Sequence, residues 1–274
     1  MDKKTKLKKR LKVWGIVLAV LFVFSVLNNK WLTVSEYDFT DSRIENGFTI
    51  VQVSDLHNAR FGRGNRRLIE RIRSLSPDII AITGDLVDGS FTNVSVGVDF
   101  CEQAAAICPT YYVTGNHEHW LSDDEKRQLF DGIRDSGTVI LDDETVTVGI
   151  NGDRVQLCGL DDDSLYTDTL RDLSAEFDRS MPVILLAHEP QYFSDYCTYS
   201  PDLVLTGHAH GGQVRLPFIG GLVAPDQGFF PKYTEGKFTD GETAMIVSRG
   251  LGNSVIPVRV FDPPEIVSVH VSGK

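Results

Sequence analysis

The stretch FTIVQVSDLH, residues 48–57, joins an apolar run of strand type to two side chains that can bind a metal ion, Asp55 and His57. Four later stretches repeat the pattern: IIAITGDLVD at 79–88, YYVTGNHE at 111–118, VILLAHE at 183–189 and LVLTGHAH at 203–210. In α/β folds, ligands gather at the carboxyl edge of a sheet, where the strands end. The five stretches therefore predict an α/β fold with a polar site at one sheet edge.

The histidines concentrate in these stretches. Residues i and i+2 of an extended chain face the same way, so Asp55 and His57 can bind one ion from a single strand end. A lone histidine such as His188 is more often a hydrogen-bonded core residue, and only the combination is specific. Oxygen and imidazole ligands without cysteine fit one or two ions of manganese, iron or zinc. Five of the chain's seven histidines lie in the five stretches, namely His57, His117, His188, His208 and His210.

The order of the remaining segments predicts two sheets. Helical spacing at 65–75, at 96–107 and from Ser122 to about Gly137 alternates with strands at 48–54, 79–83 and 111–114, and an edge strand precedes them at 31–39. A second sheet begins with short strands at 139–141, 145–150 and 155–160. A helix at 170–177 follows, and then strands at 183–186, 203–206, 245–247, 258–261 and 266–271. We expect a four-layer αββα sandwich of two mixed β-sheets flanked by helices.

The charge of the chain is unevenly distributed. Residues 1–30 hold eight of the 27 basic side chains and one of the 38 acids, which leaves 19 basic against 37 acidic residues, or a net charge of −18, on the remainder. A body this acidic repels nucleic acid, so we expect no nucleic-acid partner. A phosphate substrate would need local cations, and bound metal ions supply them.

The N-terminus has the composition of a membrane anchor. A basic tail at residues 1–12 precedes the uncharged run VWGIVLAVLFVFSVL at 13–27, which is short for a bilayer core of about 20 residues. A signal peptide and a short anchor both fit that length. The flanks favour an uncleaved transmembrane signal anchor at 13–30, because no small-residue cleavage pattern follows and Trp14 and Trp31 sit at interfacial positions. The positive-inside rule then predicts a cytoplasmic N-terminus and a single domain, 31–274, on the outer face of the membrane.

With its motifs in order, the chain resembles the calcineurin-like metallophosphoesterase superfamily. The motifs D-x-H, G-D-x-x-D, G-N-H-[DE], a lone H and G-H-x-H all lie within the stretches quoted above, and the resemblance extends over about residues 48–271. Three later segments resemble the membrane-anchored YkuE/YaeI-type branch: GHAHGGQVRLPFIGGLVAP at 207–225, KYTEG at 232–236 and SRGLGNSVIPVRVFDPPEI at 248–266.

The resemblance implies a role for each site residue. Two divalent or trivalent ions of Mn, Fe or Zn would be bound. Asp85 would bridge them and would count as a catalytic residue. His117 would be a catalytic histidine that meets the phosphate and assists the leaving oxygen. Glu118 stands where many relatives have aspartate, and an acid that is one methylene longer would have to reach the ring of His117 differently. The first ion would be held by Asp55, His57 and His210, and the second by Asn116, His188 and His208.

The function implied is that of a membrane-anchored phosphohydrolase of phosphodiesterase or pyrophosphatase type, with a metal-bridging hydroxide as nucleophile. The branch suggests a nucleotide-linked lipid such as UDP-2,3-diacylglucosamine, but that chemistry belongs to the cytoplasmic leaflet. The predicted orientation favours another envelope phosphate ester. The alternative is a non-catalytic metal-binding or scaffold module with the same fold.

Four residues near the motifs have less defined roles. Asn58 and Arg60 fit either phosphate contacts or a solvated loop. His119 fits a surface or rim position. Asp88 is expected to hold its loop by accepting backbone hydrogen bonds.

Overall fold

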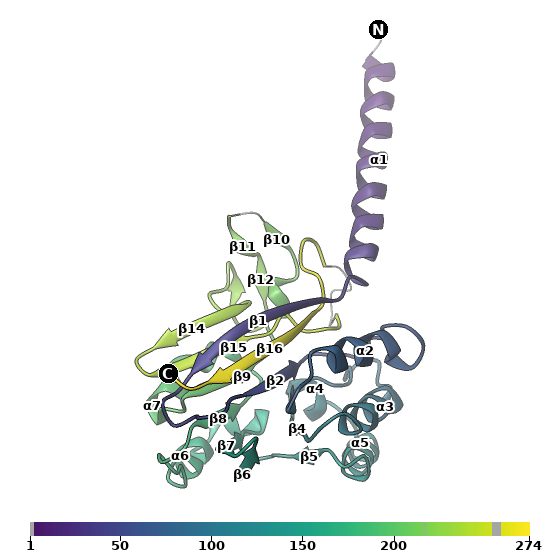
Figure 1. Ribbon diagram of the computed structural model, residues 1–274. Coiled ribbons are helices and arrows are strands. Elements are labelled where there is room, and N and C mark those ends of the chain that lie inside the picture. Colours follow the sequence, from purple (N-terminus) through teal and green to yellow (C-terminus); the bar gives the residue numbers. More distant parts are fainter. Residues whose placement is uncertain (1–2, 217, 254–258) are drawn as a thin grey trace.

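A computed structural model describes residues 3–216, 218–253 and 259–274 (Figure 1). Its helices are α1 (Lys3–Asn28), α2 (Arg66–Ser74), α3 (Val94–Ala105), α4 (Asn116–His119), α5 (Asp123–Asp135), α6 (Thr169–Ser174) and α7 (Phe193–Tyr199). Short 3₁₀ helices are η1 (Arg63–Asn65), η2 (Asp162–Tyr166), η3 (Pro190–Tyr192) and η4 (His210–Gly212).

The strands, in chain order, build two large sheets and two small hairpins. They are β1 (Thr33–Thr40), β2 (Phe48–Val53), β3 (Ile79–Thr83), β4 (Thr110–Val113), β5 (Val139–Ile140), β6 (Glu144–Ile150), β7 (Asp153–Gly159), β8 (Val183–Leu186), β9 (Leu203–Thr206), β10 (Arg215–Leu216), β11 (Gly220–Gly221), β12 (Val223–Ala224), β13 (Gly228–Phe229), β14 (Gly236–Asp240), β15 (Thr243–Val247) and β16 (Glu265–Ser272).

Both large sheets are mixed. The first has the order β1-β16-β2-β3-β4-β5, with β16 antiparallel to β2 and the other neighbours parallel. The second has the order β14-β15-β9-β8-β7-β6, with parallel pairing except at its two outer pairs. The predicted α/β fold with two mixed sheets is therefore confirmed.

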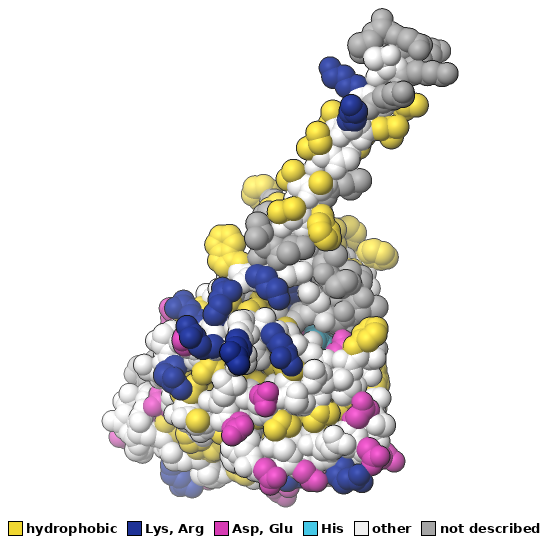
Figure 2. Space-filling view, turned by 90° about the vertical axis from the view of Figure 1, so that its right-hand side faces the viewer, with side chains coloured by type: hydrophobic (Ala, Val, Ile, Leu, Met, Phe, Trp, Pro, Cys, Tyr) yellow, Lys and Arg dark blue, Asp and Glu magenta, His cyan; other side chains and the backbone are white. Residues whose placement is uncertain are grey.

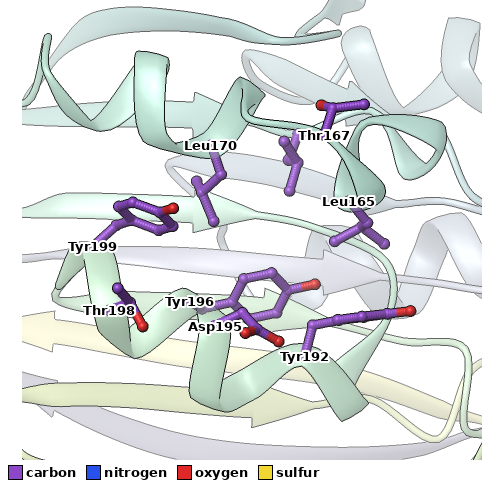
Figure 3. Close-up of a pocket in the computed structure, with 9 residues that line it drawn as sticks. Leu165, Thr167, Leu170, Tyr192, Asp195, Tyr196, Thr198 and Tyr199 are labelled. Atoms are coloured by element: carbon purple, nitrogen blue, oxygen red, sulfur yellow. The ribbon is translucent and has the colours of Figure 1, made fainter.

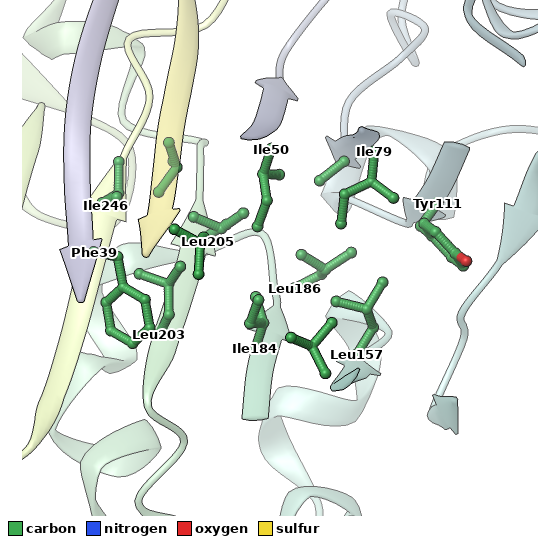
Figure 4. Close-up of a cluster of buried hydrophobic side chains, with 14 of the residues drawn as sticks. Phe39, Ile50, Ile79, Tyr111, Leu157, Ile184, Leu186, Leu203, Leu205 and Ile246 are labelled. Atoms are coloured by element: carbon green, nitrogen blue, oxygen red, sulfur yellow. The ribbon is translucent and has the colours of Figure 1, made fainter. Parts of the chain in front are cut away.

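The two sheets face each other across an apolar core (Figure 4). Ile50 of β2 and Ile79 of β3 point from the first sheet, while Leu186 of β8 and Leu205 of β9 point from the second, and all four are buried. Every second strand residue faces this core because side chains alternate along a strand. The opposite faces of the same strands pack against helices.

Helices cover the outer face of each sheet (Figure 1). On the first sheet, α2 buries Leu68, Ile69 and Ile72, and these residues join an apolar cluster that includes residues of α3 and α5. On the second sheet, α6 and α7 contribute to a separate cluster. The predicted start of α5 at Ser122 is confirmed, because Ser122 and Glu125 form a capping box.

Several predictions differ from the structure. The second sheet was expected to begin with the strand at 139–141, but β5 pairs with β4 and belongs to the first sheet. The expected helix at 170–177 ends at Ser174, and strand β14 together with both small hairpins was not predicted. Of the strand expected at 258–261, residue 258 lies outside the described residues, and Val260 makes only an isolated bridge to Val214. Short, glycine-rich pairs such as β10–β11 carry too few alternating residues to give a strand pattern.

Helix α1 projects from the body (Figure 1). Only its last turn is buried, at Ser25 and Asn28, among the side chains that the structure describes. Across residues 3–216, 218–253 and 259–274, we find no helix with the length and apolar character needed to cross a membrane.

Candidate metal centre

All seven predicted ligands lie just beyond the carboxyl ends of central strands from both sheets. Asp55 and His57 follow β2, Asp85 follows β3, Asn116 follows β4, His188 follows β8, and His208 and His210 follow β9. The backbone N–H of His208 donates to both carboxylate oxygens of Asp55, at 3.0 and 3.1 Å, and so joins the two sheet edges. The structure therefore brings together the residues that the sequence placed far apart.

Asp55, His57, Asp85 and His210 form the first group of potential ligands, and all four are buried. The Nε2 atom of His57 lies 3.2 Å from Nε2 of His210 and 3.3 Å from Oδ2 of Asp85. Nε2 of His210 is 3.5 Å from Oδ1 of Asp55. Two imidazole nitrogens and two carboxylates thus converge on one point.

Asp85 also belongs to a second group, with His188 and His208. The same Oδ2 atom of Asp85 lies 3.3 Å from Nε2 of His188, as it does from Nε2 of His57. Nδ1 of His208 lies 3.1 Å from Oδ1 of Asn116. One carboxylate oxygen therefore stands between two histidines, which is the position that a bridging ligand requires.

The hydrogen bonds of His188 test whether this site suits a metal. Its Nδ1 lies 2.8 Å from the carbonyl oxygen of Thr83, which can only accept, so Nδ1 carries the proton and Nε2 presents a lone pair. In the neutral ring that lone pair would face the Asp85 carboxylate, so either a proton on Nε2 or a metal ion must lie between the two atoms. Burial opposes a charged imidazole, but Asp85 outweighs it and raises the pKa of His188 well above the usual range. The donor set fits a metal ion.

The backbone of the site is strained. Left-handed φ angles are uncommon for residues other than glycine and cost ~1–3 kcal/mol each in such regions. At position 207 a side chain is excluded, because a Cβ atom on Gly207 would lie 1.8 Å from Oγ of Ser54. The turns after the strands are therefore shaped to aim the ligands. The residues with positive φ are Asp55 (51°), His57 (41°), Asp85 (52°), His208 (63°) and His210 (46°).

His117 lies beside the ligands and is held by the backbone. Its Nδ1 accepts the N–H of Gly89 at 3.0 Å, which places the proton of the neutral ring on Nε2. Its ring packs edge-on against that of His57, with centroids 4.5 Å apart. Burial lowers the pKa of His117, although the charge of Asp85 acts in the opposite direction. A neutral His117 with a hydrogen-bond donor at Nε2 results.

Glu118 acts on the neighbouring loops. Its carboxylate accepts the backbone N–H groups of Gly115, Asp85 and Leu86 at 2.8–2.9 Å, and that of Val87 at 3.3 Å. Burial, followed by the charge of Asp85, raises the pKa of Glu118 to about 7, while the N–H donors act against that rise. Glu118 thus links the loop after β3 to the loop after β4. The ring of His117 is oriented by the backbone N–H of Gly89.

Two residues that support the histidines were missed by sequence reasoning. Asp226, in the turn between β12 and β13, places Oδ2 3.0 Å from Nε2 of His208. Arg259 is buried, lies 3.3 Å from Nδ1 of His210 and forms an ion pair with Asp262 at 3.2 Å. Burial, and then the charges of His57 and Arg259, hold the pKa of His210 well below its usual range. Asp226 directly follows the quoted segment 207–225, and Arg259 lies in the quoted segment 248–266. The resemblance of these segments to the YkuE/YaeI-type branch was the signal in the sequence that could have indicated these two residues.

Further acidic groups lie near the second ligand group. Glu189 belongs to a further potential ligand group with His208 and Asp226. Asp162 is buried, and this burial raises its pKa to about 7. Beyond them, a cavity of about 210 Å³ opens between α6 and α7, lined by leucines and tyrosines including Leu165, Leu170, Tyr192, Tyr196 and Tyr199 (Figure 3).

The four residues with open roles are placed as follows. Asp88 accepts the backbone N–H groups of Ser90 and Phe91 at 2.8 and 2.9 Å, so its predicted structural role is confirmed. His119 is half-buried and pairs with the carboxylates of Asp161 and Asp163 at 3.2 and 3.0 Å. Asn58 donates to the carbonyl of Phe91 at 2.8 Å. Arg60 is exposed and borders a small depression with Val96 and Asp99.

The fold and this cluster define a metal-dependent hydrolase of phosphoric esters, and sequence comparisons agree. The family model for calcineurin-like phosphoesterases matches residues 48–212, and the chain belongs to this family.

Three relatives illustrate the similarity. An uncharacterized metallophosphoesterase of Bacillus subtilis, YkuE, is 32% identical over 80% of this chain and 77% of its own. The phosphodiesterase YaeI of Escherichia coli is 28% identical over 82% of each chain. A transmembrane protein with metallophosphoesterase domain from Bos taurus is 30% identical over 98% of this chain and 64% of its own. The predicted family and enzyme class are confirmed.

Proposed function

We propose that this protein is a phosphodiesterase that holds two metal ions at the sheet edge and acts at a membrane surface. The observation that carries the proposal is the position of Asp85, whose Oδ2 lies 3.3 Å from Nε2 of both His57 and His188. Asp55, His57 and His210 would complete one ion's ligands, and Asn116, His188 and His208 the other's. When bound, such ions lower the pKa of a coordinated water and neutralise charge on phosphoryl oxygens.

The protein's own residues supply the rest of the chemistry. His117, with Nδ1 committed to the N–H of Gly89, is positioned to donate from Nε2 to a phosphoryl or leaving oxygen. Gly207 has no side chain and so leaves room for Ser54 and Asp55, which allows the Asp55 carboxylate to point into the site. Glu118 fixes the loops that carry Asp85 and His117 by accepting the backbone N–H groups of Asp85 and Gly115.

The membrane location is supported by the apolar run at 13–27 and by a relative named as a transmembrane protein. We infer that α1 tethers the domain, residues 31–274, and that the substrate is an amphiphilic phosphate ester of the envelope. A phosphodiester is favoured over a pyrophosphate because YaeI is named a phosphodiesterase. A nucleotide-linked lipid such as UDP-2,3-diacylglucosamine contains a pyrophosphate bond and is therefore the less favoured substrate.

Hydrolysis of bis(p-nitrophenyl) phosphate by the full-length chain in detergent tests the proposal. We expect no activity after chelation and recovery on adding manganese, iron or zinc. Activity that survives chelation would refute a metal-dependent mechanism. Tight metal binding with no hydrolysis under any metal would instead indicate a non-catalytic metal-binding or scaffold module.

A further inference from the structure

The two small hairpins expose an unusual concentration of large apolar side chains. The β10–β11 turn carries Phe218 and Ile219, with relative exposures of 109% and 58%. Phe229 and Phe230, in and after β13, are 82% and 68% exposed. Soluble proteins rarely leave several large apolar side chains together in water, and such a surface marks an interaction site. We call these four side chains the hairpin tips.

Strands β10, β11 and β12 lie at the same end of the molecule as α1 (Figure 1), and β13 pairs with β12. Contacts support this placement, because Asn28, in the last turn of α1, donates to the carbonyl of Arg259 at 3.5 Å. The next residue, Val260, bridges to Val214 and accepts the N–H of Arg215, where β10 begins. The base of the β10–β11 hairpin is thus connected to the end of α1 through residues 259 and 260.

Helix α1 presents a matching apolar surface. Trp14, Ile16, Val20 and Phe22 are each more than 60% exposed, so nothing in the described part of the body covers them. The uncharged run is short for a bilayer span. Further apolar contacts at the same end would therefore strengthen an attachment that α1 begins.

Basic side chains flank this end of the molecule (Figure 2). Arg63, Arg66, Arg67 and Arg71, in η1 and α2, are all exposed. Arg67 and Arg71 also line a shallow cavity of about 360 Å³ together with Leu32, Glu70 and Ser74, close to where α1 ends. Apolar tips and exposed arginines, both at the end of the molecule where α1 joins the body, match the two parts of an anionic phospholipid, its acyl chains and its phosphate.

We propose that the hairpin tips insert into the interface of a lipid bilayer that contains anionic phospholipids, beside α1. This inference rests on the tether in the proposed function and deepens it. The turn between β12 and β13 also carries Asp226, whose carboxylate lies 3.0 Å from His208. The β12–β13 hairpin would then contact both the bilayer surface and the candidate metal centre. The phosphate of an amphiphile in the membrane would therefore lie close to that centre.

Photocrosslinking of the full-length chain in vesicles of phosphatidylglycerol and phosphatidylethanolamine tests this placement. The photoreactive p-benzoyl-phenylalanine replaces Phe218 or Phe229, and in a matched control it replaces Val139. Val139 is also exposed, at 42%, but lies on β5, at the edge of the first sheet opposite β1. We expect at least about tenfold more lipid adduct at 218 and 229 than at 139, since only interfacial side chains contact acyl chains.

Equal lipid yields at the three positions, or none at the hairpins, would overturn the proposal. Crosslinked pairs of the chain in place of lipid adducts would also overturn it and assign the face to a second copy. Hydrolysis of bis(p-nitrophenyl) phosphate is measured in the same samples. Lipid adducts without hydrolysis would refute the proposed enzymatic function alone, whereas hydrolysis without adducts would refute the hairpin contact alone.

Discussion

The strand-end ligands and the segment after β9 build the candidate site in different ways. The ligands Asp55, Asp85 and His188 each follow a buried strand by two residues, and tight turns aim them. The later segment, of which residues 213–216, 218–253 and 259–262 are described, adds Asp226 and Arg259, and each of these contacts one histidine. The sheets thus place the ligands, and the later segment holds two of their rings. Variants in the two regions should therefore fail in different ways.

The largest effect is expected at Asp85, where one oxygen serves both ligand groups. Asp85→Asn removes the bridging charge, so both metal content and hydrolysis of bis(p-nitrophenyl) phosphate should be lost. Asp178→Asn, in the loop after α6, is the matched control, because an asparagine can still accept the N–H of Ser180. Full metal loading of Asp85→Asn, measured by elemental analysis, would contradict the bridging position.

His117→Ala should separate chemistry from metal binding. Its ring is held beside the ligands by Gly89 and donates no atom to either proposed ligand set. We expect normal metal content and a turnover lower by roughly 10²–10⁴, the range for a positioned proton donor. His119→Ala, a histidine paired with Asp161 outside the site, is the control and should keep its activity. Unchanged turnover in His117→Ala would remove this residue from the mechanism.

Arg259→Met should affect stability more than chemistry. The change leaves Asp262 buried without its partner, and losing one member of a buried ion pair costs ~3–5 kcal/mol. The exposed Arg171, paired with Asp168, is the control, and Arg171→Met should not change urea unfolding measurably. Adding Asp262→Asn to Arg259→Met should recover part of the loss. Wild-type stability in Arg259→Met would show that the buried pair is not a structural requirement.

The difference between the regions also explains what the sequence could predict. The ligands could be found because each follows an apolar run directly, so a local pattern of strand, turn and acid or histidine identifies them. The supports could not, since Asp226 is 18 residues from His208 and Arg259 is 49 residues from His210. Their pairing depends on how short hairpins fold over the sheet edge. Likewise, the role of Glu118 in linking two loops could not be predicted from the sequence, because it depends on where the folded chain places four backbone N–H groups.

The smallest effect is expected at Asp226, which acts on the second ion through His208. The bond from Nε2 of His208 fixes the ring so that Nδ1 presents its lone pair beside Asn116. Asp226→Ala should weaken binding of one metal ion about 10–100-fold, the range for residues that orient a ligand. Asp226→Asn keeps an acceptor and should weaken it less.

Metal titration followed by calorimetry distinguishes this role from a general loss of stability. A structural defect would weaken both binding steps and lower the unfolding midpoint, whereas a positioning role predicts that only one step weakens. Glu242→Gln, an exposed acid in the turn between β14 and β15, is the matched change of charge and should alter neither step. Equal weakening of both steps in Asp226→Ala would mean that the later segment supports the whole site and does not orient one ring.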